Sequence, residues 1–252
     1  MFVKIGNLKV HYKVVGQGAP LLLLHGWGCD AKAVSKLQKH LEKQFTTYAI
    51  DLPGFGLSTA PTEIWGSAEY ANLIAQFINV ANIVDPILIG HSMGGKIIIN
   101  LVAHNLVNAK KIVLFSSAGV RLPQAFKLKL KICFFKVVKF LAKLPLLKTI
   151  FGARLELYKK KFGSTDYRNA SGQMRSVLVK VVNEDVTTLL PQIKVPTLLL
   201  WGDQDTSTPL ASGKIMHKMI SGSELKVFSG SGHFPFLDNY EKVVIELDGF
   251  LK

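Results

Sequence analysis

One serine has the surroundings that a catalytic nucleophile needs. Ser92 lies in the segment GHSMGG at residues 90–95, which contains the G-x-S-x-G spacing of a nucleophile elbow. An apolar strand pattern precedes it and an apolar helix pattern follows, so the serine is expected at a strained turn whose small neighbours let strand and helix approach. The pattern predicts that Ser92 is a nucleophile. The alternative is a Gly-rich turn in which Ser92 only caps the helix.

A serine hydroxyl also needs a base that takes its proton and an acid that orients the base. His233 follows one strand pattern in a Gly-rich loop, and Asp203 and Asp205 follow the strand before it, so both partners come in the order that this chemistry requires. We favour Asp205, which lies deeper in its loop and four residues before Pro209, and keep Asp203 as the alternative. Capping of the next helix is the simpler role for either aspartate.

The segment HGWG at residues 25–28 follows a further apolar strand, where a loop can donate to an oxyanion. We expect the backbone N–H groups of Trp27 and Met93 to form this oxyanion hole. The expected lining of the substrate pocket consists of loop residues around these groups: His25, Gly26, Trp27, His91 and Phe234. A fourth Gly-rich loop at residues 51–58 lacks the Lys-Ser/Thr of a phosphate-binding loop, and we interpret it as a structural turn.

Strands and helices alternate around these loops. Apolar runs predict strands at residues 10–15, 21–24, 47–50, 87–89, 111–115, 197–201 and 225–228. Helix-period segments lie at residues 33–43, 67–81, 93–104, 210–219 and 240–251. This alternation predicts an α/β fold with a mostly parallel sheet, whose site lies at the carboxyl ends of the strands.

The net charge of +14 is concentrated in one segment. Residues 121–182 hold 15 Lys and Arg against two acidic residues, a net charge of +13, and the other 190 residues carry a net charge of +1. This segment is helical in pattern and interrupts the alternation. We therefore expect a core formed by residues 1–118 and 186–252, with a basic helical cap, or lid, at residues 119–185.

Within this cap, residues 126–144 are amphipathic at the helical period, with lysines on one side and Leu, Phe and Val on the other. We interpret the lysines as a solvated face over an apolar face that closes the pocket. The alternative is weak association with anionic membranes or acyl carriers. Nucleic acid is not an expected partner, because no nucleic-acid-binding motif accompanies the charge.

Two distant cysteines, Cys29 and Cys133, exclude a disulfide-rich scaffold and a cysteine-based zinc site. The N-terminus has no signal-peptide pattern, and no apolar stretch is long enough for a membrane span. We expect a cytoplasmic protein, monomer or homodimer, that uses no metal and no cofactor.

These motifs together resemble the α/β-hydrolase superfamily over essentially the whole chain: HGWG at 25–28, DLPGFGLS at 51–58, GHSMGG at 90–95, GDQD at 202–205 and GH at 232–233. The resemblance implies an eight-stranded, mostly parallel sheet with helices on both faces and a helical cap inserted after the sixth strand. It also implies Ser92 as nucleophile, Asp205 as acid, His233 as base, and the Trp27 and Met93 amides as the oxyanion hole.

The function that the resemblance implies is that of a serine hydrolase, of the carboxylesterase or lipase kind, which cleaves a small-molecule ester through an acyl-enzyme. An acyl or anionic ester is among the expected substrates. A serine at the elbow disfavours haloalkane dehalogenases and epoxide hydrolases, which carry aspartate there. The alternatives are a carbon–carbon bond or thioester hydrolase with the same triad, or a binding protein on this fold without turnover.

Overall fold

The computed structural model describes residues 1–122 and 165–252. Its strands form one eight-stranded sheet in the order β1-β2-β4-β3-β5-β6-β7-β8. The strands are β1 (Phe2–Ile5), β2 (Leu8–Val15), β3 (Ala19–Leu24), β4 (Phe45–Ile50), β5 (Ile87–His91), β6 (Lys111–Phe115), β7 (Thr197–Gly202) and β8 (Glu224–Phe228). The helices are η1 (Ala31–Val34), α1 (Ser35–Leu41), α2 (Ser67–Val80), α3 (Met93–Ala103), α6 (Thr165–Asn169), α7 (Gly172–Asn183), η2 (Thr187–Gln192), α8 (Leu210–Met219), α9 (Pro235–Asp238) and α10 (Tyr240–Leu251).

The sheet is parallel from β4 to β8 and antiparallel only at its N-terminal edge. β1 pairs with β2 and β2 with β4 in antiparallel register, whereas β4, β3, β5, β6, β7 and β8 run parallel to their neighbours. The carboxyl ends of the parallel strands therefore meet at one edge, where the loops after β3, β5, β7 and β8 come together. The motifs HGWG, GHSMGG, GDQD and GH lie in these four loops, and DLPGFGLS lies in the loop after β4 at the same edge.

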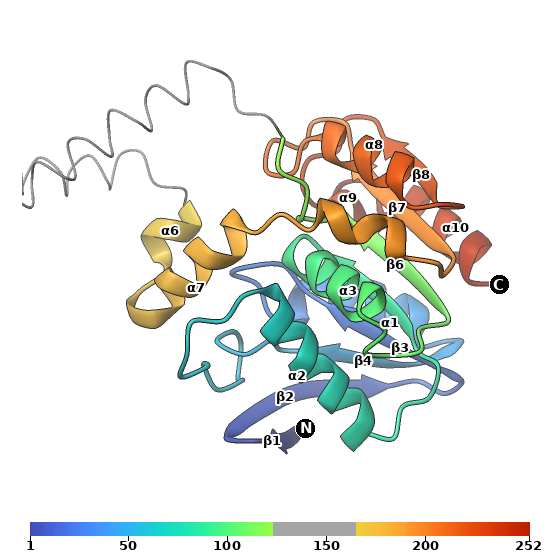
Figure 1. Ribbon diagram of the computed structural model, residues 1–252. Helices are drawn as coiled ribbons and strands as arrows, with labels where there is room; N and C mark the ends of the chain where they lie inside the picture. The colour runs from blue at the N-terminus through green and yellow to red at the C-terminus, as the bar shows by residue number, and fades with distance from the viewer. Residues whose placement is uncertain (123–164) are drawn as a thin grey trace, which may run out of the picture.

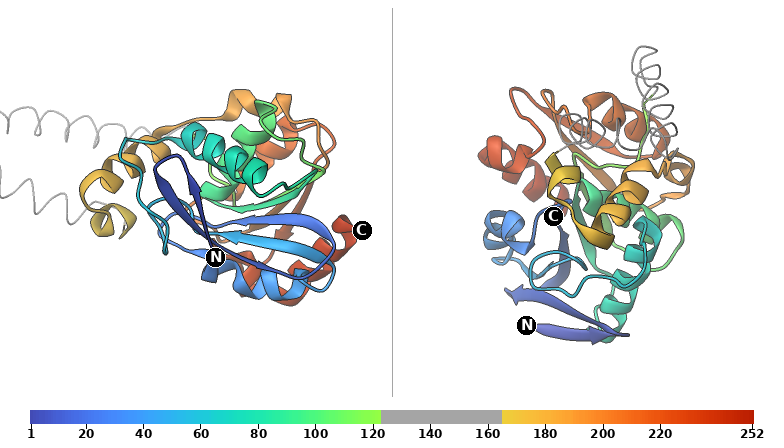
Figure 2. Two further views of the ribbon diagram at one scale, coloured as in Figure 1. Left: turned by 90° about the horizontal axis from the view of Figure 1, so that it is seen from below. Right: turned by 90° about the vertical axis from the view of Figure 1, so that its left-hand side faces the viewer.

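Two apolar cores cover the two faces of the sheet, and β3 shows why its sequence is apolar throughout. Leu22 and Leu24 point into the core beneath α2, α3 and α8, while Leu21 and Leu23 point into the core beneath α1, α9 and α10. Figures 1 and 2 show the helices in these two layers on either side of the sheet. Because alternate residues of a strand face opposite sides, a strand covered on both faces must be apolar at each position.

The helix before the nucleophile strand illustrates how the sequence sets the packing. In α2 the buried side chains Tyr70, Ile74 and Phe77 repeat at helical spacing and face the sheet. At its start, Glu69 accepts a hydrogen bond from the Gly66 amide at 2.7 Å, which satisfies one of the free N–H groups of the helix end. Truncation of a side chain as buried as Phe77 costs about 3 to 5 kcal/mol of stability.

The predicted fold class is confirmed, with local differences. β1 was not predicted, because this four-residue strand has one buried residue, Ile5, and pairs only with β2. The single helix predicted at residues 33–43 is divided into η1 and α1, since Asp30 caps a short 3-10 turn before the α-helix begins. The amphipathic segment at residues 126–144 lies outside the described residues.

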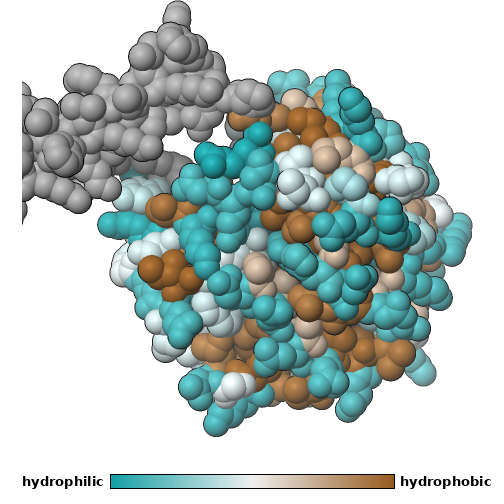
Figure 3. All heavy atoms as spheres, in the orientation of Figure 1, coloured by the Kyte–Doolittle hydropathy of each residue, from teal (hydrophilic) through white to brown (hydrophobic). Residues whose placement is uncertain are grey.

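The surface of the described part is mixed. Figure 3 shows hydrophobic residues in small groups between hydrophilic ones on the face that carries α2, α3 and α8. In residues 1–122 and 165–252 no helix combines the length and the apolar character needed to cross a membrane.

Candidate active site

Ser92 occupies a strained turn between β5 and α3. Its φ of 51° and ψ of −110° lie in a sparsely populated region for a residue with a side chain. The Ser92 amide donates to the Phe115 carbonyl oxygen at 3.0 Å, which ties the turn to β6. A Cβ at Gly94 would overlap the Leu24 carbonyl oxygen, and one at Gly90 would lie 2.6 Å from the Gly94 carbonyl carbon. The glycines of the motif are therefore required by close approach of backbone to backbone.

His233 and Asp205 form a hydrogen-bonded pair beside this turn. His233 Nδ1 lies 2.9 Å from Asp205 Oδ2, and the other carboxylate oxygen accepts from the Ser207 and Thr208 amides, each at 2.9 Å. Burial alone would raise the pKa of Asp205, but the hydrogen bonds from His233 and Thr208 lower it to about 2. Asp205 is therefore ionised at neutral pH and holds the proton of His233 on Nδ1.

Asp203, the alternative acid, lies elsewhere in the same loop. Its Oδ1 accepts from the Gly230 amide at 2.8 Å, and this bond joins the loop after β7 to the loop after β8. No hydrogen bond joins Asp203 to His233 in the described part of the chain. The geometry therefore favours Asp205 over Asp203 as the partner of the histidine.

His91, the residue before the serine, supports the loop that carries His233. The ring is buried, and its Nε2 lies 2.9 Å from the His233 carbonyl oxygen. Its ring centroid is 4.6 Å from that of Phe234 and 5.2 Å from that of Phe236. Burial lowers the pKa of His91 to about 3, so the neutral ring donates through Nε2–H. A Cβ at Gly26 would approach His91 Nδ1 to 2.8 Å, which explains the glycine there.

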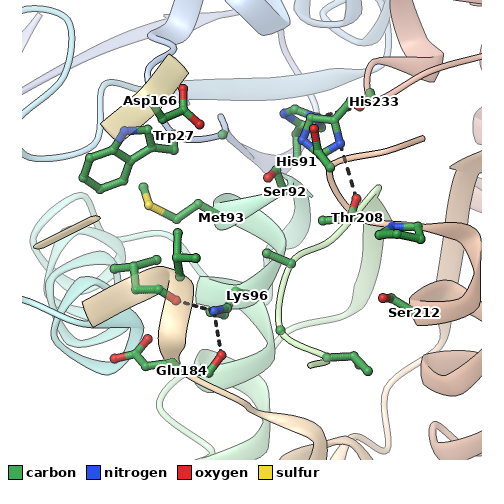
Figure 4. Close-up of a pocket in the computed structure, with 18 of the residues that line it drawn as sticks. Trp27, His91, Ser92, Met93, Lys96, Asp166, Glu184, Thr208, Ser212 and His233 are labelled. Atoms are coloured by element: carbon green, nitrogen blue, oxygen red, sulfur yellow. Dashed lines mark hydrogen bonds between the residues drawn. The ribbon is translucent and has the colours of Figure 1, made fainter. Parts of the chain in front are cut away.

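The Trp27 and Met93 amides have no hydrogen-bond acceptor among residues 1–122 and 165–252. Both residues line the pocket together with Ser92 (Figure 4). The Trp27 ring packs edge-on against Phe55 at a centroid distance of 4.8 Å, which fixes the loop after β3. Two such N–H groups beside a nucleophile can stabilise a negative oxygen.

The pocket itself has a volume of about 860 Å³. Ser92 and His233 both line it, although the Ser92 hydroxyl makes no hydrogen bond to a described residue. The opposite wall comes from the chain between β6 and β7. Its apolar part is formed by Val120, Leu122, Leu178, Val181 and Val182, and its polar or charged part by Arg121, Thr165, Asp166 and Glu184. Such a mixture of apolar walls and a few polar groups is typical of a small-molecule site.

Four of the five residues predicted to line the pocket do so: Gly26, Trp27, His91 and Phe234. His25 is the exception. Its side chain is buried away from the pocket, where Nδ1 donates to the Gly26 carbonyl oxygen at 2.8 Å and Nε2 accepts from the Leu52 amide at 3.0 Å. Burial lowers the pKa of His25, so the ring is a neutral brace between two loops.

The loop after β4 is a structural turn, as predicted. Asp51 accepts hydrogen bonds from the Ala31 amide at 2.7 Å, from the Leu57 amide at 2.9 Å and from the His11 ring at 2.9 Å. These bonds hold its own loop against η1 and β2. In residues 1–122 and 165–252, no cluster of three or more His, Cys, Asp or Glu side chains is arranged to hold a metal ion.

Sequence reasoning missed Lys96, the fourth residue of α3. It is 2% exposed and lines the pocket, and its Nζ donates to the Val181 and Glu184 carbonyl oxygens at 2.6 and 3.1 Å. The available signal was a single lysine within the apolar run GGKIIINLV, one helical turn after Ser92. Lys96 and Asn100 are the polar residues of this run and lie one helical turn apart, a spacing that a solvated stripe would also give, yet the structure buries both side chains.

Comparison with known proteins agrees with this geometry. The chain matches the family model described as alpha/beta hydrolase fold over residues 19–240. A pimeloyl-[acyl-carrier protein] methyl ester esterase of Legionella pneumophila (strain Corby) is 27% identical over 251 residues, which cover 97% of this chain and 100% of that protein. An esterase from Exiguobacterium antarcticum is similar in structure, with a TM-score of 0.76 and 26% identity, covering 99% of this chain and 98% of that one.

A membrane phospholipase A, described as a bacterial virulence factor, is also similar in structure. Its TM-score is 0.75 at 25% identity, and the match covers 100% of this chain and 84% of the phospholipase. The family match spans most of the chain and includes all the loops described above. The protein belongs to the α/β-hydrolase fold family.

Proposed function

We propose that the protein is a serine hydrolase that cleaves carboxylic esters, with Ser92 as nucleophile, His233 as general base and Asp205 as the acid that orients it. The observation that carries this proposal is the 2.9 Å contact between His233 Nδ1 and Asp205 Oδ2 in the pocket that also contains the strained Ser92. A histidine held in this way presents its free Nε2 to a nearby hydroxyl group.

In the proposed reaction, His233 Nε2 takes the proton of the Ser92 hydroxyl as Ser92 Oγ attacks the ester carbonyl. The negative oxygen of the tetrahedral intermediate accepts hydrogen bonds from the Trp27 and Met93 amides. His233 then donates this proton to the alcohol oxygen as the bond between that oxygen and the carbonyl carbon breaks. The alcohol departs, and the acyl group remains bound to Ser92. In the second half of the reaction His233 takes a proton from a water molecule, whose oxygen attacks the acyl carbonyl. The bond to Ser92 Oγ then breaks, the acid leaves, and His233 returns the proton to Ser92 Oγ.

The Ser92 hydroxyl must turn toward His233 in the substrate complex, because it makes no hydrogen bond to a described residue in the structure. Catalytic hydrogen bonds often tighten only when substrate is bound. Removal of one amide from an oxyanion hole costs about 3 to 4 kcal/mol of transition-state stabilisation, so correct placement of these donors is a major part of the proposed rate enhancement.

The comparisons support an ester substrate, because two similar proteins are named esterases. The apolar wall between β6 and β7 supports a pocket for an acyl chain. We take residues 119–185 to be a cap over this pocket, since Thr165, Asp166 and Leu178 line it opposite the sheet edge. The partner that follows from this proposal is a small-molecule ester.

The test is hydrolysis of p-nitrophenyl esters of increasing acyl length by the wild-type protein and by Ser92→Ala and His233→Ala. We expect the wild type to hydrolyse at least one ester and either variant to lose at least about 10³-fold in kcat. A variant with an unaltered circular dichroism spectrum and the wild-type rate would refute the assigned role of that residue. A parallel series of thioesters measures whether oxygen esters are preferred.

A further inference from the structure

A buried cation lies in the pocket and takes no part in the proposed reaction. Lys96 is 2% exposed, and Figure 4 shows its Nζ bonded to two backbone carbonyl groups. These belong to Val181 and Glu184, at the C-terminal end of α7, where the partial negative charge of a helix end favours a cation. An ammonium group has three protons, and only two have acceptors in the described part of the chain.

No carboxylate among the described residues lies within 4.0 Å of this ammonium group. The Glu184 carboxylate is engaged elsewhere, since one oxygen accepts from the Ser67 amide at 2.9 Å and from the Ser67 hydroxyl at 2.6 Å. Burial lowers the pKa of Lys96, and the negative charges of Glu184 and Asp185 offset part of this effect by raising it. A buried charge that lacks a counter-ion is costly, and an anion that entered the pocket would relieve that cost.

Lys96 lies on the same face of α3 as Ser92. The Lys96 amide donates to the Ser92 carbonyl oxygen at 3.2 Å, so the two residues are one helical turn apart, with Cα atoms separated by roughly 6 Å along the axis. Both line the same pocket. A ligand attached to Ser92 can therefore extend along α3 toward the ammonium group.

Figure 4 also shows on which side of the serine Lys96 lies. His233 is on one side of Ser92, and Lys96 is on the other, beyond Met93. In the proposed reaction the alcohol leaves beside His233, because it takes its proton from this ring. The acyl part of the ester must then extend away from His233, in the direction of Lys96.

We propose that Lys96 is an anion-recognition residue, and that the preferred substrate is an ester whose acyl chain ends in a carboxylate. This inference rests on the proposed function, since it assigns the acyl half of the ester to the region of Lys96. The carboxylate takes the third proton of Nζ, the apolar wall of Leu178, Val181 and Val182 contacts the methylene groups between the two ends, and the ester carbonyl reaches Ser92.

The test compares charged and neutral esters of equal acyl length. The charged probes are the monomethyl esters of succinic, glutaric and adipic acids, and the neutral probes are the methyl esters of butyric, valeric and caproic acids, all at pH 8. A hydrogen-bonded ion pair of this kind is worth roughly ten- to a hundredfold in kcat/KM. We expect the wild type to prefer the charged ester by about this factor at one or more chain lengths.

Lys96→Met keeps the length of the side chain and removes the charge. We expect the ratio of kcat/KM for the charged ester to kcat/KM for the neutral ester to fall to about one in this variant. Lys180→Met is the matched control. It removes a lysine of α7 that pairs with Glu69 at 2.7 Å on the surface and does not line the pocket, so the ratio of charged to neutral ester should remain that of the wild type.

An equal loss on both esters in Lys96→Met would overturn the proposal, because it would mean that Lys96 only fixes α7. If this variant does not fold, the wild type alone decides the question, because a preference for neutral esters at all three lengths contradicts anion recognition. Hydrolysis of neutral esters without a preference for charged ones overturns this inference alone. Failure to hydrolyse any ester overturns the proposed function as well.

Discussion

Mild acid should destabilise the fold through His91. The ring is buried between the nucleophile strand and the His233 loop, and burial lowers its pKa from 6.5 to about 3. In the unfolded chain the same ring binds a proton with a pKa of about 6.5. Because the folded state binds this proton less readily, the contribution of the neutral ring to stability is complete above pH 6.5. It is lost progressively as the pH falls toward 3.

Each pH unit below 6.5 removes about 1.4 kcal/mol of unfolding free energy through such a group. Between pH 7 and pH 5 the expected loss from His91 alone is therefore about 2 kcal/mol. His25 acts in the same direction, since burial lowers its pKa as well. His91→Gln does not titrate and still carries an N–H group for the His233 carbonyl oxygen, so it removes the His91 part of the pH dependence.

The assay is urea unfolding at pH 7, 6 and 5, followed by the fluorescence of the three tryptophans. We expect the wild type to lose about 2 kcal/mol more than His91→Gln between pH 7 and pH 5. His104→Gln replaces an exposed histidine of the same protein and should keep the wild-type dependence. Parallel pH curves for wild type and His91→Gln would refute the reasoning.

Two further predictions use matched pairs of variants. Asp205→Asn should lower kcat for ester hydrolysis by up to roughly 10⁴-fold, since an amide fails to hold the histidine in its working tautomer, whereas Asp203→Asn should stay within about threefold. Comparable losses of kcat in both variants would mean that the conformation of the loop, and not the Asp205 carboxylate, determines the rate. Gly94→Ala should lower the free energy of unfolding by at least about 2 kcal/mol, because its methyl group would overlap the Leu24 carbonyl oxygen. Gly249→Ala, at an exposed position of α10 with nothing near its Cβ, should raise the free energy of unfolding by up to about 1 kcal/mol, and both variants are measured by urea unfolding.

The parts of the site that the sequence predicts well are those that depend on local geometry. Ser92 lies at a turn whose glycines are spaced for one strand-to-helix connection, and the loops after β7 and β8 start where apolar strands end. Because parallel strands deliver their carboxyl ends to one edge, Asp205 and His233 could be placed side by side without knowledge of any long-range contact.

Other assignments depend on contacts between distant segments, which no local pattern contains. Asp203 accepts a hydrogen bond from the Gly230 amide, whereas Asp205 pairs with His233. The sequence pattern of the loop alone is compatible with either aspartate as the partner of the histidine. His25 was expected in the pocket because it starts the HGWG motif, yet its ring turns inward to the Leu52 amide. Lys96 reaches carbonyl groups 85 and 88 residues away in the chain, so its role follows only from the folded structure.

The proposed reaction requires Ser92 to be the nucleophile of this pocket. The most direct measurement is treatment of the folded protein with a fluorophosphonate probe, followed by digestion and mass spectrometry of the labelled peptide. We expect one adduct, on Ser92, that is absent in Ser92→Ala and that forms at least about 10²-fold more slowly in His233→Ala, since the base is missing. Labelling of another residue, or no labelling of the folded wild type, would contradict it.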